Sequence, residues 1–332
     1  MTATRPVEIP TEWGGKVPTQ VFIDEALTIL KVASEARVAL KMLGGLAIRI
    51  HSLNEEEFAN RLGRSAEPGQ EYSDIDFATY YKSREGVKRI MESLGYSKRP
   101  STMSTSASQR QIYFHPKGWF YIDVFWDKLK AANHPINFRG RLEIDPISIP
   151  LADLLLEKLQ IISFSRKDMI DTLLLLKAHT VAEKEEPETI DTDRIAHVLS
   201  RDWGFWYTVT TNLRGIKEYV KKMTVISPQE LSELIAKVDQ ILSTISSTPK
   251  SLRWRLRAVA RTKKKWYNPV ETEETVGGFG IWRLRNEAWP SASLSQKLLN
   301  SKTCRMVAPN LLQLIYIGAS SRLSAERRGR AR

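Results

Sequence analysis

The sequence predicts an α+β protein in which a core built on a mixed β-sheet is followed by a mostly helical domain. Two observations support this fold class. Before Pro150, short apolar segments alternate with segments of helical periodicity, as in a sheet covered by helices. After Pro150, apolar residues recur at helical spacing as far as residue 246. A chain of 332 residues is long enough for about two domains.

We divide the chain into a leader (1–20), a mixed-sheet core (21–150), a helical domain (151–248) and a basic C-terminal region (249–332). In the core we expect a helix over 21–36, a strand over 37–43, a helix over 46–52, a polar insertion over 54–72, a strand over 74–81, a helix over 84–94 capped by Ser83 and closed by Gly95, strands over 111–115 and 119–126, and further strands within 136–149. Helices are expected over 151–164, 168–181, 191–200, 203–223 and 227–246.

Composition narrows the class of protein. Apolar residues make up 42% and charged residues 27% of the chain, which is ordinary for a soluble globular protein. The single cysteine, Cys304, rules out an internal disulfide and fits a reducing compartment. The leader has no apolar signal-peptide segment, and no apolar run approaches the ~20 residues of a membrane span. We therefore expect a cytoplasmic protein without a membrane partner.

The positive charge is concentrated at one end. The formal net charge is +12, yet residues 250–332 alone contain 18 Lys and Arg against 5 Asp and Glu, a net of +13. Within this region, Arg253-Trp254-Arg255 and Trp266-Tyr267 interleave cations with aromatic rings, as single-stranded nucleic-acid binders do. Such asymmetry indicates a nucleic acid or another polyanion as partner. The alternative is a solubilising region whose aromatic rings pack while its cations stay in water.

The central motif begins at Gly44-Gly45, directly after the expected strand 37–43. Two glycines after a strand allow a tight turn and a close approach of a ligand to the backbone. A helix over 46–52 would then present its N-terminus to an anion. The glycine pair is therefore a candidate phosphate-binding turn.

Asp74-Ile75-Asp76 supplies candidate metal ligands. Residues two apart in a strand share a face, so both carboxylates would point the same way while Ile75 and Phe77 turn to the core. Asp is disfavoured in strands, and holding Mg²⁺, which prefers oxygen ligands shared with substrate phosphates, would explain two of them. The alternative is a solvated edge or turn.

Asp123 lies within the apolar segment 120–126, where a carboxylate is costly to bury unless it is paired or bound to a metal. A buried salt bridge is one explanation. If this strand lies beside Asp74 and Asp76, however, the three carboxylates form a cluster that can hold two metals and clamp the oxygens of a phosphoryl transfer.

Other chemistries find less support in the sequence. The five histidines are scattered and show no zinc-ligand spacing. No Walker-type phosphate-binding loop is present. The histidines are His51, His115, His134, His179 and His197.

Taken together, Gly44-Gly45, Asp74-Ile75-Asp76 and Asp123 resemble the DNA-polymerase-β-like nucleotidyltransferase superfamily. The segment 151–158, which ends in Glu157-Lys158, and the segment 166–171 resemble its AbiEii-type branch of toxin nucleotidyltransferases. The resemblance covers about residues 25–225. It departs from the family pattern in two places: residues 53–72 separate the glycines from the aspartate pair by more than usual, and Leu46 replaces the usual Ser or Thr, which leaves Ser73 as a substitute.

The resemblance implies a mixed-sheet nucleotidyltransferase core that binds an NTP and Mg²⁺ and transfers a nucleoside monophosphate to a hydroxyl group. The glycines would lie near the nucleotide phosphates, Lys158 near the triphosphate, and Asp171 would support the site. Asp74, Asp76 and Asp123 would hold Mg²⁺. RNA, including a tRNA end, is the acceptor we expect, and a toxin would have a cognate antitoxin as partner. Two alternatives stay open: a nucleic-acid-binding or regulatory protein with an inactive core, and a small-molecule nucleotidyltransferase that modifies antibiotics.

Overall fold

The computed structural model describes residues 9–64, 71–100, 110–129 and 134–267. Its main sheet is mixed and has the strand order β1-β2-β5-β4-β3. The parallel pair β2–β5 lies between antiparallel neighbours, since β1 pairs with β2, β4 with β5 and β3 with β4 in the antiparallel sense. The strands are β1 (Leu40–Leu43), β2 (Asp74–Thr79), β3 (Ser97–Lys98), β4 (Arg110–Phe114) and β5 (Tyr121–Trp126).

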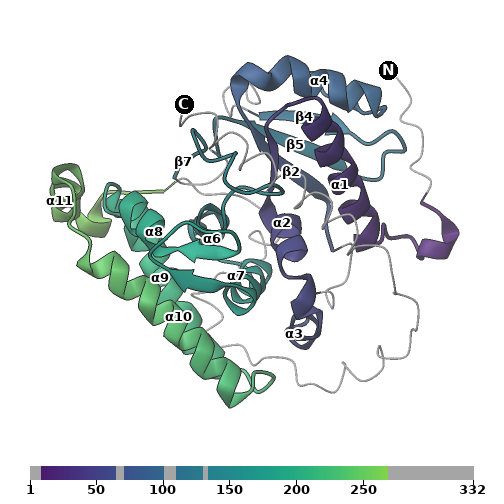
Figure 1. The fold of residues 1–332 in the computed structure, drawn as a ribbon. Coiled ribbons are helices and arrows are strands. Elements are labelled where there is room, and N and C mark those ends of the chain that lie inside the picture. The colour runs from purple at the N-terminus through teal and green to yellow at the C-terminus, as the bar shows by residue number, and fades with distance from the viewer. Residues whose placement is uncertain (1–8, 65–70, 101–109, 130–133, 268–332) are drawn as a thin grey trace, which may run out of the picture.

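Apolar residues of β2 and β5 anchor the centre of this sheet. Ile75, Phe77, Ile122 and Val124 are fully buried, and hydrophobic burial of this kind is the main favourable contribution to folding. Helices α1 (Thr19–Glu35) and α4 (Arg84–Ser93) lie against the sheet in Figure 1. Short helices α2 (Gly44–His51) and α3 (Glu56–Arg61) follow β1.

The second half is mostly helical, as expected. Its helices surround the two-stranded parallel sheet β8–β9, and α2 lies between this half and the main sheet (Figure 1). Reciprocal capping boxes at Ser165 and Ser227 fix the starts of α7 and α10. The elements are α6 (Leu151–Leu159), α7 (Arg166–Ala178), β8 (Thr180–Ala182), β9 (Thr189–Asp191), α8 (Thr192–Leu199), α9 (Trp203–Val220), α10 (Pro228–Ser247) and α11 (Leu252–Val259).

The α+β prediction with a mixed sheet is confirmed, and the differences are local. The first strand begins at Leu40, because Arg37 adopts a positive φ of 57° that breaks extended structure. Ser83 precedes α4, but its side chain makes no capping hydrogen bond to any described residue. Gly95 closes this helix with a φ of 83°, as expected.

Two further expectations predicted more regular secondary structure than the protein has. Within residues 136–149 the structure contains only β7 (Ile136–Asn137), which pairs with β6 (Lys128–Leu129), followed by turns and an isolated bridge from Ser148 to Met42. The helix expected over 151–164 ends at Leu159. Periodicity cannot separate helix from turn in short apolar segments, since both bury the same residue types.

The division of the chain into leader, core, helical domain and basic region stays a prediction. The buried side chains show how some of these regions pack together. Residues on both sides of Pro150 belong to one hydrophobic cluster, which contains Val124 as well as Leu174. The described part of the leader packs on the core, because Val17 is buried in it and the Trp13 ring lies 4.7 Å from that of Trp119. Cys304 and the rest of residues 268–332 lie outside the described residues. Within the described ranges, no helix combines the length and apolarity needed to cross a membrane.

Candidate active site

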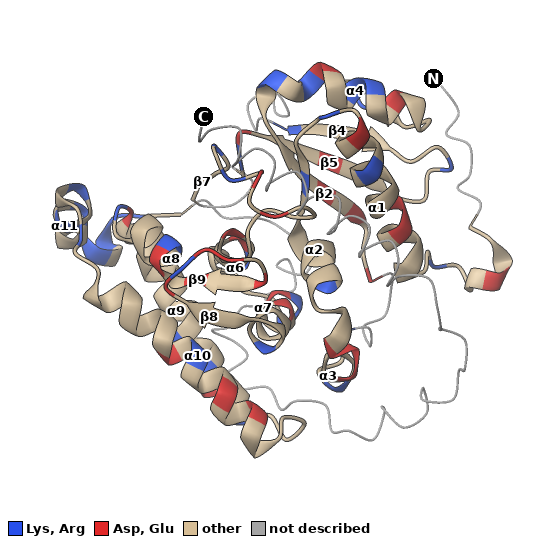
Figure 2. Cartoon of the chain, in the orientation of Figure 1, with Lys and Arg blue, Asp and Glu red and all other residues tan. Residues whose placement is uncertain are grey.

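The three aspartates of the predicted cluster meet on neighbouring strands. β2 and β5 run parallel, and their register places Asp76 directly beside Asp123. Asp74 lies two residues before Asp76 and therefore shares its face of the sheet. One carboxylate oxygen from each of the three residues lies within 4.8 Å of the others. Figure 2 shows acidic positions on β2 and β5.

The cluster is electrostatically strained without a cation. Burial raises the pKa of Asp76 well above its ordinary value, and the charges of Asp74 and Asp123 raise it further. Burial raises the pKa of Asp123 to about 6, although Arg110, 3.2 Å away, opposes the shift.

One carboxylate oxygen of Asp123 is an unsatisfied hydrogen-bond acceptor among the described residues. Its Oδ1 is buried and finds no hydrogen-bond partner among the described residues. A buried carboxylate oxygen without a partner is costly, and a divalent cation with oxygen ligands would satisfy it. The donor set of Asp74, Asp76 and Asp123 therefore fits Mg²⁺.

Gly44 and Gly45 begin α2 instead of forming a separate turn before it, and they lie between this cluster and a second group of charges. A Cβ atom on Gly44, whose φ is 80°, would lie only 2.6 Å from Asp76 Oδ2. A Cβ atom on Gly45 would lie 2.9 Å from Asp171 Oδ2. Glycine is required at both positions, because the backbone passes too close to two carboxylates for a side chain.

The second group joins α6 and α7. Lys158 Nζ lies 3.0 Å from Asp171 Oδ2 and 3.4 Å from Asp168 Oδ1. Arg64 Nε donates to Asp171 Oδ1 at 2.7 Å. Burial alone would raise the pKa of Asp171, but Lys158 and Arg64 outweigh burial and lower it. Asp171 thus stays ionised and fixes Lys158 in its charged form behind the glycine pair.

The sequence-predicted residues are therefore brought together in two adjoining groups. Asp74, Asp76 and Asp123 form the first group, and Lys158 and Asp171 form the second, with Gly44-Gly45 between them. Ser73 is exposed beside the first group, where its Oγ donates to Asp74 Oδ1 at 3.0 Å. The long segment 53–72 does not separate the glycines from the aspartates in space.

Sequence reasoning missed three residues of this site. Glu157 Oε2 accepts a hydrogen bond from the Gly44 backbone N–H at 3.1 Å, and burial raises its pKa to about 7. Arg64 and Arg110 neutralise Asp171 and Asp123. Glu157 could have been noticed as the acidic neighbour of Lys158 in an apolar helix. The two arginines lie on segments whose position follows only from tertiary structure.

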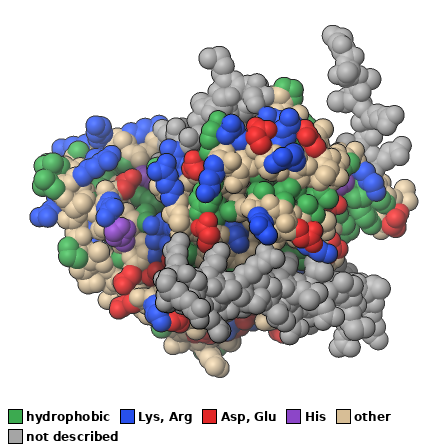
Figure 3. All heavy atoms as spheres, turned by 45° about the horizontal axis from the view of Figure 1, so that its top comes forward, with side chains coloured by type: hydrophobic (Ala, Val, Ile, Leu, Met, Phe, Trp, Pro, Cys, Tyr) green, Lys and Arg blue, Asp and Glu red, His purple; other side chains and the backbone are tan. Residues whose placement is uncertain are grey.

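The described part of the basic C-terminal region forms a distinct surface. Residues 250–267 contain eight Lys and Arg and no Asp or Glu. Figure 2 shows basic positions along α11, and Figure 3 shows basic side chains at that end of the molecule. The rings of Trp254 and Trp266 pack against Trp206 and Tyr207 of α9, at centroid distances of 5.1 and 5.0 Å. These tryptophans are thus structural. Arg257 is held as well, because it donates to the backbone carbonyls of Arg261 and Lys264 and lies over the Trp203 ring. The side chains of Arg253, Arg255, Arg261, Lys263, Lys264 and Lys265 are exposed and remain available to a partner.

Comparisons with known proteins add little. No family model matches the chain, and no curated protein matches it. A comparison with solved structures finds the antibiotic-resistance factor ANT(2'')-Ia, at 14% identity and a TM-score of 0.25, with 69% of this chain and 95% of that chain covered. At this identity and score the likeness carries no argument about fold or function.

Proposed function

We propose that the protein is a Mg²⁺-dependent nucleotidyltransferase that moves a nucleoside monophosphate from an NTP to an acceptor hydroxyl group. The observation that carries this proposal is the convergence of Asp74, Asp76 and Asp123 from two neighbouring parallel strands, with their oxygens within 4.8 Å of one another. Like charges this close, one of them buried, repel one another, and a bound divalent cation would compensate them.

The three aspartates would hold the metal. Bound Mg²⁺ would neutralise charge on the phosphates and polarise the reacting oxygens. Asp74 and Asp76 would hold the metal that neutralises the triphosphate, and Asp123 would help to activate the acceptor hydroxyl group. The acceptor oxygen forms a bond to the α-phosphorus, the bond from that phosphorus to the oxygen bridging to the β-phosphate breaks, and pyrophosphate leaves with that bond's electron pair. The hydroxyl proton passes to a base at the site.

The second group of charges would position the nucleotide. Gly44 and Gly45 carry no side chain where the backbone passes Asp76 and Asp171, so a phosphate group can approach the glycine pair. Lys158 would attract the triphosphate as a point charge, with Asp171 fixing its ammonium group at 3.0 Å. Ser73 would supply a hydroxyl contact to the nucleotide in place of the Ser or Thr that Leu46 replaces.

RNA, including a tRNA end, is the acceptor we propose, and the exposed cations of residues 250–267 support it because they can track a phosphate backbone. A toxin with a cognate antitoxin follows only from the resemblance of the segments 151–158 and 166–171 to the AbiEii-type branch.

An acceptor screen tests the function. The full-length protein is incubated with Mg²⁺ and each of the four NTPs, labelled on the α-phosphate, together with total RNA or with an aminoglycoside. Label on RNA supports the proposal, and label on the aminoglycoside alone redirects it to a small-molecule nucleotidyltransferase. Failure to label either acceptor with any NTP, while RNA is still bound, would indicate a binding protein with an inactive core.

A further inference from the structure

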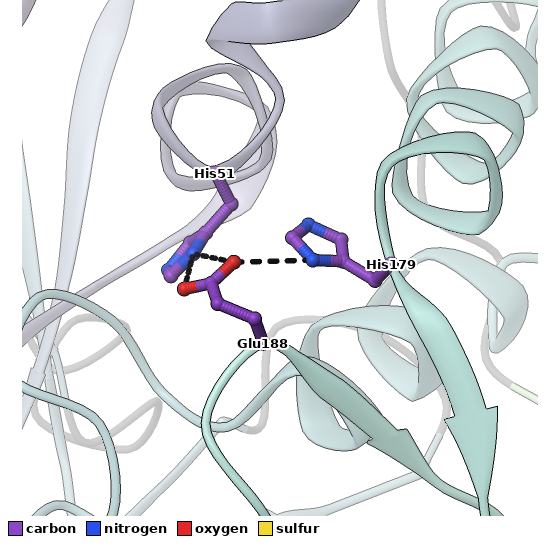
Figure 4. Close-up of side chains that lie close together, drawn as sticks. All are labelled: His51, His179 and Glu188. Atoms are coloured by element: carbon purple, nitrogen blue, oxygen red, sulfur yellow. Dashed lines mark hydrogen bonds and ion pairs between the residues drawn. The ribbon is translucent and has the colours of Figure 1, made fainter.

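Two buried histidines and a glutamate from three separate segments meet at the far end of α2 (Figure 4). His51 ends α2, His179 follows α7, and Glu188 precedes β9. Glu188 Oε1 lies 3.1 Å from His51 Nδ1, and Glu188 Oε2 lies 3.1 Å from His179 Nδ1. One ligand atom from each residue lies within 4.8 Å of the others.

The surroundings of His51 fix the protonation state of its Nε2, the ring nitrogen that does not contact Glu188. Ser148 Oγ donates to the Ile149 carbonyl at 2.6 Å, so its hydrogen is already used. Ser148 Oγ must therefore accept the hydrogen bond from His51 Nε2, which lies 2.9 Å away. Asp145 Oδ1, at 3.7 Å, lies on the same side of the ring. His51 thus carries a proton on Nε2, and this outer contact resembles those that orient metal-binding histidines.

The Nδ1 atoms of His51 and His179 both face Glu188. Their state depends on whether a cation is bound. Without a cation, His51 Nδ1 must also be protonated, because a nitrogen lone pair would be repelled by the carboxylate. Burial would lower the pKa of His51, but the hydrogen bond to Glu188 and the charge of Asp145 outweigh burial and raise it. With a cation, both Nδ1 atoms and the carboxylate become ligands, and a proton is released.

The two rings are only 2% exposed, whereas the Glu188 side chain is 44% exposed. Glu188 also has a φ of 56°, a conformation uncommon for residues other than glycine. Its carboxylate lies between the two rings (Figure 4). The cluster is therefore closed on the protein side and reachable from solvent on the carboxylate side.

We propose that His51, His179 and Glu188 bind a divalent transition-metal ion of the Zn²⁺ class. Two imidazole nitrogens and one carboxylate oxygen are a common zinc donor set, with a fourth position left for water. Mg²⁺ prefers oxygen ligands, so this site and the aspartate cluster select different metals. The ion would tie α2, which carries Gly44-Gly45 at its other end, to the helical half of the protein.

Sequence spacing could not reveal this site. His51 and His179 come from opposite halves of the chain, and Glu188 lies in a charged turn after Pro187. The expectation that the histidines show no zinc spacing was correct as a statement about spacing. It does not apply to ligands that tertiary structure brings together.

Zinc titration of the full-length protein by isothermal calorimetry, with excess Mg²⁺ to occupy the aspartates, tests the proposal. Wild type is expected to bind one equivalent and to release about one proton per ion near pH 7, measured by repeating the titration in buffers of different ionisation enthalpy. Glu188→Gln and His179→Gln should weaken binding by more than about 100-fold, since even outer-shell changes cost 10–100-fold.

His134→Gln is the matched control. His134 is also buried, its Nδ1 lies 3.1 Å from Asp202, and its Nε2 has no hydrogen-bond partner among the described residues. This variant should bind zinc as wild type does. Glu188→Gln changes a half-exposed side chain, so it decides the question if His179→Gln does not fold. Absence of a bound equivalent in wild type, or wild-type affinity in Glu188→Gln, would overturn the proposal, and neither result depends on transferase activity.

Discussion

Replacing Asp123 by asparagine should stabilise the metal-free protein, and the gain should depend on pH. The pKa of Asp123 rises from its ordinary 3.8 to about 6 in the fold. Between these values the folded protein keeps a proton that the unfolded chain releases, so stability falls as pH rises through this window. Each pKa unit corresponds to about 1.4 kcal/mol, so ionised Asp123 costs about 3 kcal/mol once the pH exceeds 6.

The amide of Asp123→Asn imitates the protonated carboxyl group and removes this cost. We expect the free energy of unfolding in EDTA to be nearly equal to that of wild type at about pH 4 and to exceed it by about 3 kcal/mol at about pH 7.5. Urea denaturation followed by circular dichroism measures both values. Asp24→Asn, which changes an exposed carboxylate on α1, is the control and should show no such difference. Equal stability of Asp123→Asn and wild type at both pH values would refute the reasoning.

Three further changes probe the rest of the site. Gly44→Ala places a Cβ atom 2.6 Å from Asp76 Oδ2 at a positive φ, so it should cost about 1–3 kcal/mol in urea denaturation and lower transfer; an unchanged protein would contradict the close approach. Lys158→Ala should raise KM for NTP at least about tenfold while costing only about 2 kcal/mol of stability, because Arg64 still pairs with Asp171; unchanged steady-state constants would make Lys158 purely structural. Charge reversal in the basic region should weaken RNA binding and flatten its salt dependence by about 0.7 per lost phosphate contact, whereas an unchanged slope in folded, NTP-binding variants would leave this region a solubilising surface. The reversed residues are Arg253, Arg255, Lys263, Lys264 and Lys265, which are all exposed.

The aspartate cluster could be predicted because its evidence is local. Alternation in Asp74-Ile75-Asp76-Phe77 fixes which side chains share a face, and the cost of burying Asp123 in an apolar strand requires an explanation from sequence alone. The parallel pairing that places Asp76 beside Asp123 was assumed rather than derived, since register depends on the whole sheet.

The charges around the cluster could not be predicted in the same way. Arg64 follows a short helix in the polar insertion. Arg110 lies on β4 opposite Phe125 and reaches Asp123 two residues along the neighbouring strand. Ion pairs between segments far apart in the chain carry no periodic signal. The same holds for His51 and His179, whose contact with Glu188 exists only in the folded protein.

Nucleotidyl transfer by Asp76→Asn tests the central claim most directly. The variant removes one carboxylate from the cluster and relieves its repulsion, so the metal-free fold should be at least as stable as wild type. Wild type and Asp76→Asn, matched for folded fraction by circular dichroism, are compared for transfer of α-phosphate label from NTP to RNA in Mg²⁺. The account predicts transfer by wild type and none by the folded variant. Transfer at the wild-type rate by Asp76→Asn would contradict it.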